Sequence, residues 1–356
     1  MSAPTIDDRR TAADEYDFRS IHPHVRFGTA SDRYAGWTGQ IYPKGQYANQ
    51  ISTRSRTLGG RSFKERTLPV ASVRDYFRHF GTLELDFPFY RPLLDSTGEP
   101  THTFFVLEQY ADHAPDEASF FLKAPQMFFA RTLRRSSGGD VRYEDNPDFL
   151  DATAYVEQFH EPVRSVLGDR LDGVIFQQEY QRVADAPTPA ENVETLDTFF
   201  RALPNDVQPH LELRSDHFLT DVYFDWLDDR GLGFVFSHWT WLPAIRRQWA
   251  LCGERFTAAD DQVVARLLTP RDVKYADAYA AAHPFDAPNP KLAETQQARD
   301  MVLDATALAF QAEAQNAQLN LIANNRAWGN APALAQTIAH RILDEEERRA
   351  AAGADS

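Results

Sequence analysis

Charged side chains of opposite sign stand at or near the ends of several short apolar segments of this sequence. Glu84, Lys123 and Glu212 are three of them. Two carboxyl groups roughly 6.5–9.5 Å apart leave room for a water, as in inverting glycoside hydrolysis. A lysine beside Glu84 can pair with it, which lowers the pKa of the carboxyl group and keeps the amine charged. We therefore predict catalytic roles for Glu84, Glu212 and Lys123; the alternative is a buried salt-bridge layer that performs no chemistry.

Polar residues at the other segment ends could bind a ligand. Arg214 and Arg266 can hold a carboxylate or phosphate through paired hydrogen bonds, or can simply neutralise Glu212 or Asp86. Amides can bind hydroxyl groups or a base edge, or can satisfy loop backbone groups instead. A lone histidine is more often a hydrogen-bonded core residue than a ligand-binding one. The predicted binding residues are Thr29, Asp86, Gln177, Arg214, His238, Arg266, Asn324 and Asn325.

A divalent metal is an alternative for the same residues. Glu84, Asp86, Glu212 and His238 offer carboxylates and an imidazole, which suit Mn, Zn or Mg. No local ligand spacing such as His-x-x-x-His accompanies them, so we predict no metal site. Glycine-rich phosphate loops, nucleophile elbows and dinucleotide fingerprints are also missing from the sequence.

The elements that must position these residues are short apolar runs that alternate with helical stretches. Runs of this kind are typical of strands buried on both faces, and alternation with helices indicates a parallel sheet. Parallel strands in a barrel all end at one mouth, where the polar residues would meet. We predict one (β/α)8 barrel with strands at 25–31, 83–89, 119–124, 173–177, 210–214, 233–238, 263–269 and 319–325.

Helical stretches are expected between these runs. An acidic first turn follows Pro189, and Gly231 is a typical C-terminal stop. The expected helices span 72–80, 104–114, 147–167, 190–203, 220–230, 292–315 and 332–349. Nothing resembles a linker, so we predict one barrel domain over 25–349, a mobile tail over 1–24 and a frayed end over 350–356.

One basic segment departs from the acidic average of the chain. The stretch 44–66 carries six lysine or arginine residues against the single acid Glu65. Because it follows the first strand, we expect a basic loop over 44–70 that overhangs the barrel mouth. It is either a mobile lid for an anionic ligand or a solvated loop that pairs with the acidic exterior.

Composition limits the function classes. The chain has 356 residues, is 43% hydrophobic and has a formal charge of −15. That charge argues against a nucleic-acid-coating surface, although a local basic patch can override it. The single cysteine, Cys252, and a charged start without an apolar run favour a cytoplasmic protein without a membrane segment.

The strand-end residues also belong to ordered motifs by which the chain resembles the YecE-like family, known as domain of unknown function 72. The motifs are Phe27-Gly28-Thr29, Gly36-Trp37, Tyr42-Pro43, Leu83-Glu84-Leu85-Asp86, Phe89-Tyr90, Lys123-Ala124-Pro125, Ile175-Phe176-Gln177, Leu211-Glu212-Leu213-Arg214, Asn324-Asn325 and Ala331-Pro332. The resemblance implies a TIM-like barrel and adds Trp37 to the predicted binding residues. It also marks a divergent member, since Asp86, Phe218, Thr269 and Arg326 stand where the family usually has Asn, Trp, Gly and His.

Together these residues indicate an enzyme that acts on a small anionic or sugar-like substrate, with a phosphorylated sugar or a nucleotide using every predicted group. Acid/base or metal-assisted chemistry of a hydrolase, lyase or isomerase would suit the carboxylates. Two other hypotheses stay open: a non-catalytic barrel that senses a metabolite or docks a partner, and a nucleic-acid-processing barrel.

Overall fold

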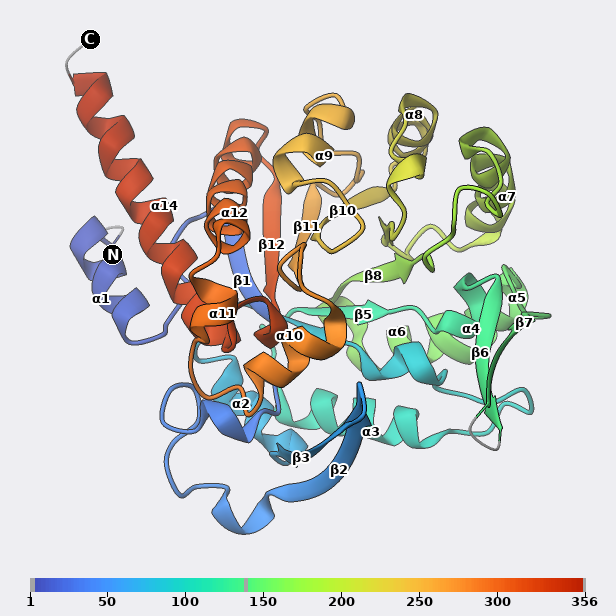
Figure 1. The fold of residues 1–356 in the computed structure, drawn as a ribbon, viewed down its shortest axis with the longest axis horizontal. Helices are drawn as coiled ribbons and strands as arrows, with labels where there is room; N and C mark the ends of the chain where they lie inside the picture. The colour runs from blue at the N-terminus through green and yellow to red at the C-terminus, as the bar shows by residue number, and fades with distance from the viewer. Residues whose placement is uncertain (1–3, 138–139, 355–356) are drawn as a thin grey trace.

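Eight parallel strands close into a barrel at the centre of the molecule (Figure 1). The structure, a computed structural model, describes residues 4–137 and 140–354. The order around the ring is β1-β12-β11-β10-β9-β8-β5-β4, and neighbouring strands are parallel throughout. The predicted (β/α)8 barrel is thereby confirmed. Its strands are β1 (Val25–Ala30), β4 (Thr82–Leu85), β5 (Phe120–Lys123), β8 (Leu171–Gln177), β9 (Pro209–Glu212), β10 (Gly233–His238), β11 (Gln262–Leu267) and β12 (Gln318–Ala323).

Helices surround the barrel and cover its outer face (Figure 1). Thr188 caps α7 (Pro189–Ala202) together with Glu191, and Gly231 ends α8 (Asp221–Arg230) in the left-handed conformation, as its position predicts. The helix expected over 147–167 is present from Ala152 to Leu167, and its middle, Val156–His160, is π-helical. Apart from α1, which is described below, the longer helices are α3 (His102–His113), α6 (Glu161–Leu167), α7 (Pro189–Ala202), α8 (Asp221–Arg230), α9 (Ile245–Leu251), α10 (Tyr275–Ala282), α12 (Gln296–Ala314) and α14 (Ala331–Ala354).

Strand residues point alternately into the barrel and toward the helices, as the pleat of a strand requires. A small apolar layer fills the interior, and a much larger core lies between the strands and the helices. The interior layer consists of Ala30, Phe121, Ile175, Val235, Val264 and Ile322. This alternation decides which strand-end side chains can reach the mouth from inside the barrel.

A histidine fills the interior where two strands have no side chain. His210, on β9, is 1% exposed and lies against Gly173 of β8 and Gly233 of β10. A Cβ atom at Gly233 would lie 2.2 Å from His210 Nδ1, and one at Gly173 would lie 2.7 Å from His210 Cδ2. The two glycines therefore provide the space that the imidazole occupies.

Gly233→Ala is expected to lower the free energy of unfolding by about 1–3 kcal/mol, because the added methyl group must displace a ring in a close-packed interior. Gly81→Ala is the matched control, since the nearest atom to its Cβ would be 3.6 Å away, in the Arg26 side chain. Urea unfolding of both variants measures the difference. Equal stabilities would contradict the tight packing around His210.

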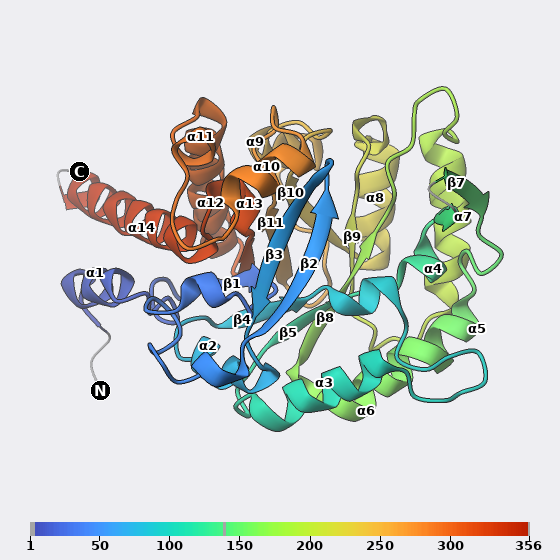
Figure 2. The same cartoon turned by 60° about the horizontal axis from the view of Figure 1, so that its bottom comes forward.

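The expected basic loop over 44–70 is a β-hairpin for most of its length. Strands β2 (Ser52–Leu58) and β3 (Arg61–Thr67) pair antiparallel across the two-residue turn Gly59-Gly60, where both glycines have positive φ. A Gly-Gly pair between polar strands of equal length is a hairpin signal. The hairpin lies beside α10, where Phe63 packs against Tyr279 (Figure 2). A second hairpin, β6 (Thr132–Ser137) with β7 (Asp140–Asp145), was likewise not expected from the sequence.

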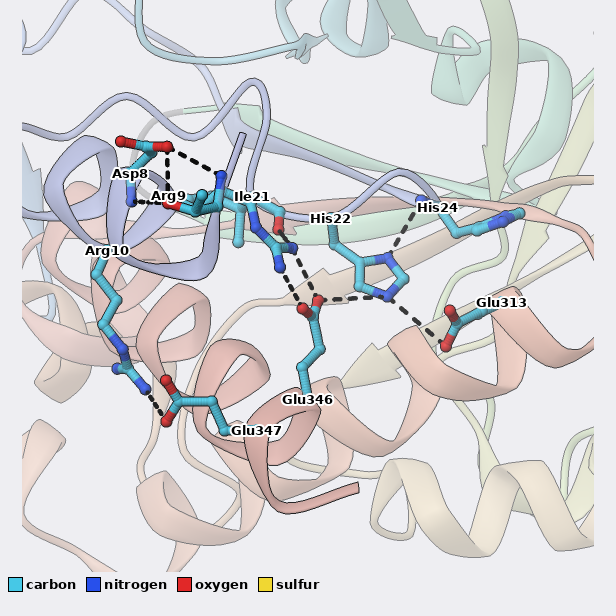
Figure 3. A network of polar contacts seen from close by, with 10 residues as sticks. Asp8, Arg9, Arg10, Ile21, His22, His24, Glu313, Glu346 and Glu347 are labelled. Atoms are coloured by element: carbon cyan, nitrogen blue, oxygen red, sulfur yellow. Dashed lines mark hydrogen bonds and ion pairs between the residues drawn. The ribbon is translucent and has the colours of Figure 1, made fainter. Parts of the chain in front are cut away.

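The segment expected to be a mobile tail over 1–24 contains a helix, α1 (Ile6–Asp14), which packs along α14. Thr5 and Asp8 form a capping box at its start. Arg9 pairs with Glu346 of α14, and Arg10 pairs with Glu347 at 2.9 Å (Figure 3). The Thr5-x-x-Asp8 spacing was the sequence signal for this helix.

The C-terminal helix also differs from its expected extent. Helix α14 continues to Ala354, beyond the helix end expected at 349, so most of the segment predicted to be frayed is helical. Residues 1–3 and 355–356 of the two predicted end segments lie outside the described residues. In the described part of the chain, no helix combines the length and the apolar character needed to cross a membrane.

Candidate functional site

Arg266 lies between two buried glutamates inside the C-terminal mouth of the barrel. Its Nε and Nη2 donate to the two carboxylate oxygens of Glu84, each at 2.6 Å, and its Nη1 donates to Glu212 Oε2. Both glutamates are fully buried, and Arg266 is 4% exposed. The alternation along each strand produces this arrangement, since Glu84 of β4, Glu212 of β9 and Arg266 of β11 all point into the barrel.

Further polar groups extend this ion pair across the mouth. Arg214 Nη2 donates to Glu212 at 2.9 Å and to Gln177 Oε1 at 2.6 Å. Lys123 Nζ donates to the same Gln177 oxygen at 2.6 Å. The structure thus brings six predicted site residues together, and we call them the charged network: Glu84, Lys123, Gln177, Glu212, Arg214 and Arg266.

The pairing inside the network differs from the expected one. Glu84 has Arg266 as its ion-pair partner, whereas Lys123 contacts the neutral amide of Gln177 and the face of the Phe89 ring, 3.9 Å away. No ion pair between Glu84 and Lys123 occurs among the described residues. A planar guanidinium between two carboxylates satisfies both of them, so the amine is left without a carboxylate partner.

Burial and charge shift the ionisation of the network. Burial raises the pKa of Glu212, but Arg214, Arg266 and Lys123 outweigh it and bring the pKa down to about 2. Burial lowers the pKa of Arg214 to about 10. Burial, together with Arg266, lowers the pKa of Lys123 to about 7. Glu212 therefore stays ionised at neutral pH, while Lys123 is divided between its two forms.

A cavity of about 700 Å³ opens at the same mouth, next to β12, β1 and β4, which are neighbours in the ring. We call it the mouth cavity. The β2–β3 hairpin forms one wall, and α10 with the following loop forms another. Six cationic residues line it: Arg33, Arg54, Arg56, Lys64, Arg66 and Arg326.

Only part of this positive charge is neutralised within the protein. Arg54 and Arg56 pair with Glu65, whose carboxylate also accepts a hydrogen bond from Tyr279 of α10. The other four cations have no carboxylate within 4 Å among the described residues. They are Arg33, Lys64, Arg66 and Arg326, and the last lies over the Tyr275 ring at 4.5 Å.

Three predicted binding residues line the mouth cavity. Asp86 accepts a hydrogen bond from Ser31 Oγ at 2.9 Å. Asn324 caps α13 (Asn325–Trp328), and Asn325 Oδ1 accepts from Trp37 Nε1 at 3.1 Å and from the Ala331 amide at 2.8 Å. The two asparagine oxygens thus serve the protein itself, while the Asn325 amide nitrogen has no partner in the described structure.

Three predicted binding residues do not join the site. Thr29 points outward from β1 to the Tyr76 hydroxyl, and Trp37 is fully buried. His238 also points outward, because its neighbour Ser237 points inward and donates to Glu212. Its Nδ1 contacts the Thr269 carbonyl at 2.9 Å, and burial lowers its pKa to about 4. His238 is therefore a hydrogen-bonded core histidine, the alternative weighed for it.

Two buried residues at the cavity, Asp32 and Tyr110, are not among the site residues predicted from the sequence. Asp32 lies two residues after the end of β1 and accepts a hydrogen bond from Tyr110 of α3 at 2.6 Å. Its second carboxylate oxygen has no partner in the described structure, and burial raises the pKa of Asp32 to about 6. The position of Asp32 just after a strand is a sequence signal for a site residue. Tyr110 gives no local signal, because its role arises from tertiary packing.

The four residues considered as metal ligands do not lie together as a ligand set. Within the described residues, no group of three or more His, Cys, Asp or Glu is placed to hold a metal ion. Of the four residues considered for a metal, Glu84 and Glu212 are bound to Arg266, and His238 lies on the other side of its strand.

These features define a (β/α)8 barrel with an internal charged network and a cationic cavity at its C-terminal mouth. The chain belongs to the family described as "Protein of unknown function DUF72", whose model matches residues 26–355. This agrees with the family resemblance of the sequence motifs.

Two solved structures show the same fold. The DUF72 family protein of Thermotoga maritima matches with a TM-score of 0.50 and 14% identity, covering 90% of this chain and 99% of that one. The DUF72 family protein of Enterococcus faecalis matches with a TM-score of 0.51 and 14% identity, covering 90% and 95%. No curated protein matches the chain.

Proposed function

We propose that this protein is an enzyme that binds a small anionic, hydroxyl-bearing compound, such as a sugar phosphate or a nucleotide, in the mouth cavity. The observation that supports this most is a set of four cations around a cavity of about 700 Å³ that have no carboxylate partner in the described part of the chain. In a chain of net charge −15, unpaired cations gathered in one concave site favour an anionic ligand over an internal structural role.

The other cavity residues fit the neutral part of such a ligand. Tyr34, Tyr90 and Tyr275 offer ring faces and hydroxyl groups, and the buried Asn325 amide nitrogen has no hydrogen-bond partner among the described residues. Ligand sites commonly combine a largely apolar or aromatic wall with a few placed polar groups. A sugar or a nucleoside attached to a phosphate would use both kinds of group.

Asp32 is better suited to proton transfer than the glutamates predicted for it. Glu84 and Glu212 are both bound to Arg266, and Glu212, with a pKa of about 2, is a poor proton donor or acceptor at neutral pH. Asp32 belongs to the cavity wall and has a pKa of about 6. We propose that the charged network supplies fixed electrostatics and that Asp32 exchanges the proton.

Anion binding can be tested on the hairpin. We expect Lys64→Gln with Arg66→Gln to weaken sulfate and glucose 6-phosphate binding by about tenfold or more, because each lost charge-assisted hydrogen bond costs about 1.5–3 kcal/mol. The dependence of affinity on salt concentration should also fall. Titration calorimetry at two salt concentrations measures both effects.

Arg61→Gln is the matched control for this experiment. Arg61 lies on the same strand of the hairpin, faces Asp277 at 3.9 Å and is not part of the cavity wall. Affinity that stays the same in the double variant and in the control, with unchanged salt dependence, would refute the cavity as the anion site.

The two alternatives stay separable from this proposal. A metabolite sensor would bind the same anion without turning it over, so a screen of phosphate esters for product formation distinguishes it. A nucleic-acid-processing barrel would retain DNA or RNA in preference to glucose 6-phosphate in a competition assay. The acidic net charge makes the second outcome the less expected one.

A further inference from the structure

Lys123 occupies an unusual position for a lysine. It is the last residue of β5 and points into the barrel, where it is 6% exposed. Its amino group donates to the Gln177 side-chain oxygen at 2.6 Å and lies 3.9 Å from the centre of the Phe89 ring. No carboxylate lies within 4 Å of it among the described residues.

The charges around Lys123 disfavour its protonated form. Arg266 of β11 and Arg214 after β9 are positive neighbours, and burial acts in the same direction. Glu212 of β9 and Glu84 of β4 oppose them, but both are already bound to Arg266. The result is a pKa of about 7, so that about half of the amines are neutral at neutral pH. A neutral lysine is the form that attacks carbonyl groups.

A hydrogen-bond donor for the substrate is present beside the amine. Arg214 shares the Gln177 oxygen with Lys123, and its guanidinium lies over the Trp239 ring at 4.5 Å. The Nη1 of Arg214 is buried and has no partner in the described structure. A buried guanidinium nitrogen without an acceptor favours an anionic group of a ligand at this place.

We propose that Lys123 is a nucleophile that forms an imine with a small carbonyl compound carrying a carboxylate or phosphate group. The lone pair of the neutral amine forms a C–N bond to the carbonyl carbon, and a proton moves from nitrogen to oxygen to give a carbinolamine. The C–O bond then breaks, one water leaves, and the imine remains. This inference rests on the proposed function, because it requires an anionic compound to enter the same mouth.

Reductive trapping tests the proposal with glyoxylate as the carbonyl probe and cyanoborohydride as the hydride donor. Reduction converts the imine into a stable secondary amine that peptide mass spectrometry locates. At pH 7 we expect Lys123 to be labelled about tenfold faster than the other lysines, since its free amine is the more abundant one. The exposed residues Lys44, Lys274 and Lys291, which lie outside the wall of the mouth cavity, are internal controls in the same digest. Labelling of these residues without Lys123, or no labelling at all, would overturn the proposal.

Gln177→Glu separates a chemical role from a structural one. The substitution keeps the shape of the side chain and places a carboxylate at the acceptor position 2.6 Å from Nζ. We expect labelling of Lys123 to slow about tenfold at pH 7 and to recover at higher pH, because the new charge stabilises the ammonium form. Labelling with an unchanged pH profile contradicts the proposal. Lys123→Arg should lose the labelled peptide and no other.

Sulfate titration of the same samples distinguishes failure of the imine proposal from failure of the proposed anion-binding function. Sulfate binding together with an unreactive Lys123 refutes the imine and leaves the anion site standing. A labelled Lys123 in a protein that binds no sulfate refutes the mouth cavity as the anion site and supports the nucleophile.

Discussion

Arg266→Met is expected to lower the free energy of unfolding by about 3–5 kcal/mol, because it leaves two buried carboxylates without their shared partner. Glu84 loses both of its hydrogen bonds to the guanidinium, and Glu212 loses one while it keeps Arg214. Methionine fills much of the space of the arginine stem, so the loss reports on charge more than on volume. Urea unfolding at pH 7 measures it.

An exposed arginine provides the comparison. Arg255 pairs with Asp225 and Asp228 at the surface, and its side chain is 35% exposed. We expect Arg255→Met to cost less than about 1 kcal/mol. Glu84→Gln and Glu212→Gln added to Arg266→Met should restore much of the stability, since they remove the stranded charges. A cost for Arg266→Met as small as that of the control would mean that water reaches the network freely.

Acid should destabilise the protein through a histidine inside the barrel. Burial lowers the pKa of His210 from 6.5 to about 4, and neither ring nitrogen has a partner in the described structure. Below pH 6.5 the His210 imidazole becomes protonated in the unfolded chain but stays neutral in the folded chain. The free energy of unfolding therefore falls as the pH drops from 6.5 to 4. A difference of this size corresponds to about 3 kcal/mol by the time pH 4 is reached.

His210→Leu removes this titration. We expect the loss of stability between pH 7 and pH 4.5 to be about 2 kcal/mol smaller in the variant than in the wild type. Only the change with pH is compared, so a uniform cost from the altered shape cancels. The exposed His102 serves as the control position, and His102→Gln should follow the wild-type curve. Parallel curves for wild type and His210→Leu would show that His210 is not the residue responsible.

The barrel and the gathering of charge at its mouth were accessible from the sequence because they depend on local patterns. A short apolar segment with a polar end indicates a strand and its direction, and parallel strands bring those polar ends together. Which face a residue takes depends on where the inward alternation begins, and this separates Ser237 from His238. The choice of ion-pair partner also depends on tertiary structure. Arg266 pairs with Glu84 from β11, which β1 and β12 separate from β4, whereas Lys123 on the adjacent strand β5 does not pair with it.

The mouth cavity was harder to predict because its walls come from distant parts of the chain. Asp32 and the hairpin follow β1, whereas Tyr275 and Tyr279 precede β12. Nothing local relates Glu65 to Tyr279, yet these residues join the two walls by a short hydrogen bond. The Gly59-Gly60 pair is a hairpin signal in the sequence, although the polar composition of the segment favours a loop.

The two walls also suggest how new ligand preferences could arise in this fold. Most of the cavity surface comes from the β1–β4 and β11–β12 connections, and the eight strands contribute little beyond their ends. Both connections could be replaced together while the Glu65–Tyr279 hydrogen bond that links them is kept. Such a replacement would change the binding surface and leave the barrel unchanged. Loop replacement of this kind lets one barrel serve many substrates, so libraries confined to these segments are the economical route to altered specificity.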